Sequence, residues 1–212
     1  EVASGVVMIV FNLIILRLRG NIGVAAYGVV ANLSLVVNSI YTGMAQGIQP
    51  ILSRLCGCGD EKGIKRILHY AVNTILVLSG CIYLLLLVAG VPIVRIFNSE
   101  QNALLQQIAL TGLRLYFTAI PFVGFNIMIS AYFTSTEKAL PAQVISLLRG
   151  FFVILPMAFL LSSLFKMTGV WLSYPVTECL TVITAIAFTV KIRYNKRYKR
   201  QRREADGIQH KL

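Results

Sequence analysis

The chain has 212 residues, of which 57% are hydrophobic and only 13% are charged, with a mean hydropathy of +0.74 and a net charge of +12. Soluble domains carry about 25% charged residues, and the charges here gather in short stretches between long apolar runs, so the composition excludes an ordinary soluble domain and predicts repeated membrane spans. Much of the positive charge directly follows the last apolar run, which favours an anionic membrane surface, and not nucleic acid, as its neighbour.

Six apolar runs are candidates for membrane-spanning helices, each of which needs about 20 residues. In chain order they cover residues 2–16, 23–51, 67–91, 104–133, 140–164 and 169–192. The connections are short, and helices satisfy their backbone polar groups internally. We therefore predict an all-α, polytopic membrane bundle over residues 1–192 and a basic tail over residues 193–212. Because the chain begins at Glu1 and not at Met, we expect a fragment or a processed form of a longer protein.

The lysines and arginines of the connections indicate the orientation. If six spans alternate, fourteen of these residues fall on the side of the 53–66 connection, the 134–139 connection and the tail, and four fall on the other side. Basic residues are enriched in cytoplasmic loops. The count predicts that the tail is cytoplasmic.

A row of polar side chains marks the second span. At 3.6 residues per turn they occupy a sector of about 100° on one helix face. They line the wall of a water-filled cavity, or they bond to neighbouring helices. We call this row the polar stripe; it comprises Asn32, Ser39, Thr42, Gln46 and Gln49. Gly43 and Gly47 of the same helix have the GxxxG spacing that favours close helix packing.

One carboxylate, Glu178, lies about ten residues into the sixth span. An unpaired charge near the membrane midplane costs at least about 2.5–3.5 kcal/mol, so a partner is expected. Arg149 of the fifth span differs from it in depth by about 7 Å, which an arginine side chain can reach. Glu178 is thus the anchor of a structural pair with Arg149, or a proton or cation site.

The sequence contains no combination typical of an enzyme. Only His69 and His210 are histidines, and we find no HExxH, GxSxG or P-loop pattern. Cys56 and Cys58 form an isolated Cys-x-Cys, whereas a structural zinc site needs four ligands. We predict that the protein is not an enzyme and has no cofactor.

Several motifs, in their order along the chain, resemble the second half of multidrug and toxic compound extrusion (MATE) transporters. The segments are GNIGVAAYG at 20–28, GMAQGIQP at 43–50, PFVGFN at 121–126, LRG at 148–150 and WLSYPVTE at 171–178. The resemblance implies one lobe of a protein with two six-helix lobes, so that this chain supplies helices seven to twelve and its partner is a missing N-terminal lobe.

The resemblance also implies a function. MATE proteins exchange Na⁺ or H⁺ for small organic, often cationic, drugs or metabolites by alternating access in the plasma membrane. Glu1 matches an acidic residue of the seventh helix in many Na⁺-coupled members and is therefore a possible Na⁺ or H⁺ site, and Glu178 is a second coupling candidate. Beside the polar stripe, Asn12, Tyr116 and Asn126 are expected to line the central cavity.

Two alternatives remain open. A flippase for lipid-linked oligosaccharides belongs to the same superfamily, and it would need cavity arginines to hold phosphates. Arg114 and Arg149 are the only candidates for that role within the spans. A membrane scaffold without transport activity would instead use its basic tail to recruit lipids or partners.

Overall fold

The fold is all-helical, in agreement with the predicted class. In this computed structural model, residues 2–209 are described, together with the side chains of residues 5–192 (except 139) and 194. They contain no strand. The elements in order are α1 (Val2–Gly57), α2 (Glu61–Phe97), α3 (Ala103–Tyr116), the 3₁₀ turn η1 (Phe117–Ala119), α4 (Ile120–Ser135), α5 (Ala139–Leu147), the π-helical segment η2 (Leu148–Phe152) and α6 (Ile154–Gln209).

Four helical stretches of the described chain are long and apolar enough to cross a membrane. Two of them, Gly5–Gly57 and Leu140–Ile192, have 53 residues each, about 80 Å at 1.5 Å per residue, far more than the 30 Å or so of a bilayer core. Each is broken where the backbone takes a positive φ, at Gly20 (63°) and at Lys166 (52°). These breaks allow each stretch to fold back on itself. A division into six spans stays a prediction.

The break at Gly20 replaces the longer connection expected at residues 17–22. Glycine has no Cβ and adopts a positive φ without steric cost. After the reversal the two parts of α1 lie against each other, since the rings of Phe11 and Tyr27 stack with centroids 5.6 Å apart. The second reversal depends on close backbone contact, because a Cβ at Gly169 would lie 1.8 Å from the Leu161 carbonyl oxygen.

The helices extend beyond the apolar runs from which the spans were predicted. α2 begins at Glu61, six residues before the predicted start, and the Asp60 side chain caps it by accepting a hydrogen bond from the Gly63 amide at 2.9 Å. An apolar run predicts only the part of a helix that lies in the hydrocarbon core of the membrane. The backbone hydrogen bonds of the helix continue beyond that core into polar residues, so the helix is longer than the run. α6 likewise continues as a helix through the basic tail to Gln209.

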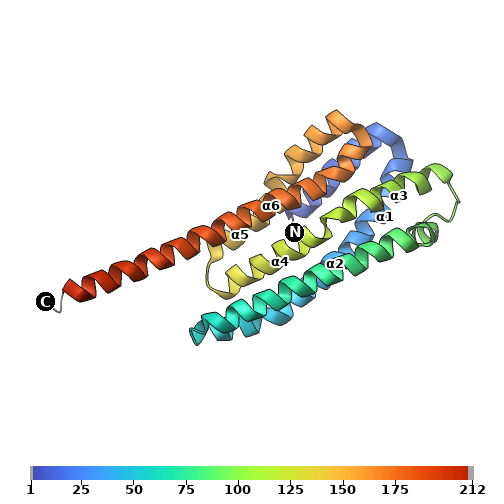
Figure 1. The fold of residues 1–212 in the computed structure, drawn as a ribbon. Coiled ribbons are helices and arrows are strands. Elements are labelled where there is room, and N and C mark those ends of the chain that lie inside the picture. Colours follow the sequence, from blue (N-terminus) through green and yellow to red (C-terminus); the bar gives the residue numbers. More distant parts are fainter. Residues whose placement is uncertain (1, 210–212) are drawn as a thin grey trace.

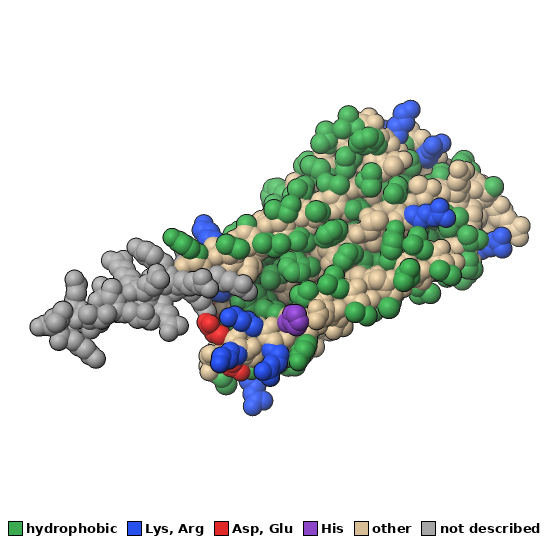
Figure 2. Space-filling model, in the orientation of Figure 1, with side chains coloured by type: hydrophobic (Ala, Val, Ile, Leu, Met, Phe, Trp, Pro, Cys, Tyr) green, Lys and Arg blue, Asp and Glu red, His purple; other side chains and the backbone are tan. Residues whose placement is uncertain are grey.

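The connections alternate between the two ends of the bundle. Figure 1 shows the turn at residues 58–60, the turn at 136–138 and the far part of α6 toward one end, and both positive-φ breaks and the 98–102 turn toward the other. On the face shown in Figure 2, hydrophobic side chains are spread over the surface between the ends, and lysines and arginines lie toward the ends. This distribution suits a protein embedded in a bilayer.

The stretch Ala103–Ser135, formed by α3, η1 and α4, is the core of the bundle. In its most apolar window 56% of the residues are buried, compared with 11–22% in the other three stretches. Gly112 and Gly124 allow its close contacts, because an added Cβ would lie 2.8 Å from the Trp171 ring and 2.7 Å from Ile75, respectively. Among the described residues nothing lies within 4 Å of a Cβ added at Gly43 or Gly47, so the close packing predicted from the GxxxG spacing is not made within this bundle.

Candidate functional site

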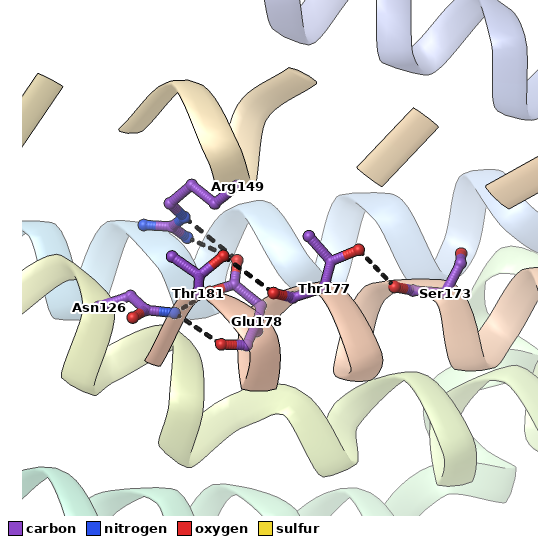
Figure 3. A network of polar contacts seen from close by, with 6 residues as sticks. All are labelled: Asn126, Arg149, Ser173, Thr177, Glu178 and Thr181. Atoms are coloured by element: carbon purple, nitrogen blue, oxygen red, sulfur yellow. Dashed lines mark hydrogen bonds and ion pairs between the residues drawn. The ribbon is translucent and has the colours of Figure 1, made fainter. Parts of the chain in front are cut away.

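A polar cluster lies inside the bundle around Glu178 of α6, whose side chain is only 1% exposed. Arg149 from η2 contacts one carboxylate oxygen, with Nη2 at 3.0 Å and Nε at 3.1 Å from Oε1. Asn126 from α4 donates its amide Nδ2 to the other oxygen, Oε2, at 2.7 Å, and to the Glu178 backbone carbonyl at 3.0 Å (Figure 3). Three helical segments therefore meet at one carboxylate.

The charge of Glu178 is balanced locally. A buried ion pair is tolerated when its remaining lone pairs and protons are also hydrogen-bonded, and Asn126 supplies the bond to the second oxygen. Arg149 keeps 21% of its side-chain surface exposed. The structure thus brings together the two residues expected to pair.

Two polar atoms at this level of α4 have no partner among the described residues. They are Oδ1 of Asn126 and Oγ of Ser130, both buried. Residues four apart lie on the same face of a helix. Buried polar atoms are nearly always hydrogen-bonded, so these two atoms are exceptions within the described bundle.

Hydroxyl side chains line the same part of α6. Ser173, Thr177 and Thr181 are fully buried, and each donates to a backbone carbonyl of the preceding turn, at 2.6, 2.7 and 2.9 Å (Figure 3 shows two of these bonds). Such bonds satisfy the hydroxyl within its own helix. The α6 face around Glu178 is therefore polar without needing partners on other helices.

An aromatic layer covers the cluster on the side of α1 and α3. The rings of Tyr116 and Tyr174 stack face to face, with centroids 4.3 Å apart and an angle of 5°. The Tyr174 hydroxyl interacts with Arg149 and with Asn38. A small pocket adjoins these rings, and its polar lining includes Ser34 and Asn38.

The polar stripe on α1 has a different environment. Four of its members are exposed and Gln49 is half-buried. The Ser39 hydroxyl bonds to the Leu35 carbonyl of the same helix at 2.8 Å, and none of the five bonds to another helix within the described part of the chain. The stripe is therefore free to face something outside this bundle.

The other predicted site residues are scattered. Asn12 is half-buried in the first part of α1, whereas Tyr116 and Asn126 are buried inside the bundle and away from the exposed stripe. Glu1 lies outside the described residues. Among the described side chains, no group of three His, Cys, Asp or Glu residues could hold a metal ion.

Sequence reasoning missed Ser34, Asn38 and Tyr174, which connect the pocket to the cluster. Ser34 and Asn38 are four residues apart and lie on the inward face of α1, next to the polar stripe. From the sequence alone, this four-residue spacing could have predicted that Ser34 and Asn38 share a helix face. Tyr174 lies four residues before Glu178, so it too shares a helix face with the carboxylate.

A comparison with protein families finds that the MatE family model matches residues 3–160. Curated relatives include the multidrug export protein MepA of Staphylococcus saprophyticus, 23% identical over 193 residues, and that of Staphylococcus haemolyticus, 26% identical over 192 residues. Each alignment covers 91% of this chain but only 42% and 41% of the relative. The chain thus spans less than half the length of the curated relatives it matches.

Solved structures of MATE transporters have the same fold. An outward-facing multidrug resistance MATE transporter superposes with a TM-score of 0.83 and an inward-facing one with 0.84, each at 14% identity. They cover 92% of this chain, which in turn covers 44% and 45% of them. A mutant of the Vibrio cholerae MATE transporter VcmN has a TM-score of 0.81 at 19% identity, over 90% of this chain and 43% of its own.

Proposed function

Because the chain belongs to the MatE family, we propose that it forms one lobe of a multidrug efflux transporter. This transporter would exchange Na⁺ or H⁺ for small organic, often cationic, compounds by alternating access. The observation that carries the proposal is the family match together with relatives named as multidrug export proteins, aligned over 91% of this chain. Since the chain spans 42% of such a relative, its partner would be a second lobe.

The polar stripe supports this role. Its exposed side chains have no hydrogen bond to another helix of the described bundle, although polar groups on a membrane helix avoid lipid. A wall of the cavity between two lobes would keep them wet. Thr42 and Gln46, one turn apart on this face, would contact substrate through hydrogen bonds.

A carboxylate would couple transport to the ion gradient. Glu178 is a buried carboxylate inside the bundle, and Glu1 remains a candidate through the family resemblance alone. The coupling requires that ion and substrate favour different conformations, so that each one shifts the equilibrium.

The orientation is part of the proposal. The multi-pass bundle would lie in the plasma membrane with the basic end of α6 in the cytoplasm. The 58–60 turn points to the same end of the molecule as α6 (Figure 1), and it is flanked by the exposed Arg54, Lys62 and Lys65. Cytoplasmic segments are rich in such residues.

Dye efflux by the full-length protein tests the proposal. In cells without other exporters, we expect it to lower the accumulation of a fluorescent cationic dye, and we expect an ionophore that collapses the coupling gradient to abolish this effect. Separate collapse of the Na⁺ and the H⁺ gradient identifies the ion. Glu1→Gln and Glu178→Gln test the two carboxylates. Dye accumulation equal to that of cells without the protein, for a panel of cationic and neutral dyes, would refute the proposal.

The two alternatives have less support. A flippase needs several free cavity arginines, but Arg149 is held by Glu178, which leaves only Arg114 among the arginines within the spans. The scaffold hypothesis predicts that removal of residues 193–212 abolishes function. A transporter would retain efflux after this truncation, provided that its expression is unchanged.

A further inference from the structure

The exposed surface of α2 has a different character from that of α1. Every exposed side chain of α2 between residues 76 and 88 is apolar, whereas the exposed face of α1 carries the polar stripe. Leu76, Leu84 and Leu87 are 55%, 61% and 41% exposed, respectively. Polar groups on a membrane helix avoid lipid, so this purely apolar surface indicates that α2 is a helix in contact with hydrocarbon.

The first turns of α2 carry a cluster of basic side chains at the end of the bundle from which α6 extends (Figures 1 and 2). This cluster, the α2 basic face, comprises Lys62, Lys65, Arg66 and His69, all of them exposed. Because they are three or four residues apart, they are neighbours on the helix surface. At 3.6 residues per turn they occupy a sector of about 100°, and Asp60 and Glu61 lie outside it. Within the described chain, none of the three lysine and arginine side chains pairs with a carboxylate.

The α2 basic face and the apolar surface form one continuous face of the helix. Leu76, Leu84 and Leu87 lie in the same sector as Arg66. Leu76 is ten residues from Arg66, or about 15 Å along the axis, which is half of a hydrocarbon core of about 30 Å. Tyr70, 59% exposed, lies between them, and tyrosines are enriched where the membrane meets water. The basic side chains are therefore at the depth of lipid headgroups.

The polar side chains at this boundary are held by local hydrogen bonds. The Thr74 hydroxyl donates to the Tyr70 carbonyl at 2.9 Å. The amide Nδ2 of Asn73 lies 3.2 Å from Nε2 of His69. An amide NH₂ group only donates, so Nε2 is the acceptor and the neutral imidazole carries its proton on Nδ1. His69 thus adds an N–H donor to the positive charges of the α2 basic face.

We propose that the α2 basic face binds the phosphate headgroup of an anionic phospholipid, whose acyl chains lie along the apolar part of the same helix face. Lysine and arginine form charge-assisted hydrogen bonds with phosphate oxygens. A zwitterionic lipid also has a phosphate, but its ammonium group would be repelled by the unpaired cations, so the site distinguishes the two classes. Free phosphate would contact the basic side chains alone, whereas a phospholipid also covers Leu76.

Spin-labelled lipids test the inference on the full-length protein in phosphatidylcholine bilayers, without any transport. The fraction of each probe that the protein immobilises gives its relative affinity, and we expect phosphatidylglycerol to be preferred over phosphatidylcholine. In Lys62→Gln/Arg66→Gln this preference should fall by about two- to fivefold, because each basic residue near the surface adds to the attraction. Arg17→Gln/Arg95→Gln removes the same charge from exposed residues at the other end of the bundle and should leave the preference unchanged.

Two further conditions separate this site from other sources of attraction. After removal of residues 193–212, a preference that depends on Lys62 and Arg66 should remain, and inorganic phosphate at matched ionic strength should not displace the lipid. The inference is wrong if the wild type prefers neither lipid, if the two double variants behave alike, if the preference vanishes with the tail, or if phosphate displaces the lipid.

A second measurement covers the case in which Lys62→Gln/Arg66→Gln does not fold. Phosphatidylglycerol with a photoactivatable group in its headgroup should label wild-type peptides from residues 61–73. Labels confined to the tail or to the 98–102 turn would overturn the inference. The inference rests on the proposed function only for the leaflet in which α2 begins: a protein without dye efflux could still bind the lipid, and an active transporter could lack the preference.

Discussion

The polar stripe of α1 and the Glu178 cluster are both polar groups within apolar helices, yet they have opposite environments. Stripe residues are mostly exposed and have no partner on other helices of the described chain. Glu178 and Asn126 are almost completely buried, and with Arg149 they join three helical segments. We infer that the cluster holds this bundle together, whereas the stripe serves whatever lies outside it. Each of the following predictions can break or sharpen this contrast.

The largest effect is expected on removal of Arg149. Arg149→Ala would leave the Glu178 carboxylate buried without its counter-charge, which costs about 3–5 kcal/mol of unfolding free energy. Denaturation of the full-length protein in detergent would measure it. Arg114→Ala is the matched control, because Arg114 is exposed, and it should cost no more than about 0.5 kcal/mol. The double variant Arg149→Ala/Glu178→Ala should recover part of the loss; equal losses from both single arginine variants would contradict the contrast.

Asn126 should matter more for stability than Asn32 of the polar stripe. Asn126→Ala removes two hydrogen bonds to Glu178, one of them to a charged oxygen, and bonds to charged groups are worth about 1.5–3 kcal/mol. Asn32→Ala should change stability by no more than about 0.5 kcal/mol. Thermal unfolding in the same detergent compares the two variants. The contrast would fail if Asn32→Ala were the more destabilising.

Glycines provide a similar test without changing polarity. Gly112→Ala would place a Cβ 2.8 Å from the Trp171 ring, and overpacking of this kind costs about 1–3 kcal/mol. Gly43→Ala, beside Thr42 of the polar stripe, meets no described residue within 4 Å and should stabilise the helix by up to about 1 kcal/mol. Unfolding midpoints that move in opposite directions would agree with this assignment of the two faces, and a Gly112→Ala midpoint at or above the wild type would not.

The smallest effect on stability is expected in the polar stripe itself. Thr42→Val and Gln46→Ala should each leave the unfolding free energy within about 0.5 kcal/mol of the wild type, because neither side chain bonds to another helix of the described bundle. Dye efflux by the full-length transporter should nevertheless fall severalfold, since these side chains would face the substrate. Efflux at wild-type level in the double variant would remove the stripe from the transport path.

The pairing of Arg149 with Glu178 was predictable because depth can be counted along a membrane helix. Each residue adds 1.5 Å, and charges within hydrocarbon need partners, so two opposite charges at similar depth in neighbouring spans point to each other. Asn126 was not predictable in the same way. It lies 52 residues from Glu178 in sequence, and a neutral amide imposes no comparable demand for a partner.

The spacing of glycines, by contrast, did not predict which glycines make close contacts within this bundle. Among the described residues the GxxxG pair of Gly43 and Gly47 has no close neighbour, whereas the isolated Gly112 and Gly124 make the close contacts. A motif records that a small face exists, but not whether another helix covers it. The aromatic partner at Gly112, Trp171, comes from a helix distant in sequence, so no local pattern could indicate it.

The sequence by itself determined the membrane class, the helical content and the ends at which basic residues gather, because the transfer of each residue into a bilayer depends mainly on that residue and its neighbours in the chain. Only the tertiary structure decided which polar groups are buried partners and which are exposed. The rotation of a helix about its own axis depends on the shapes that pack against it, and those shapes come from other parts of the chain.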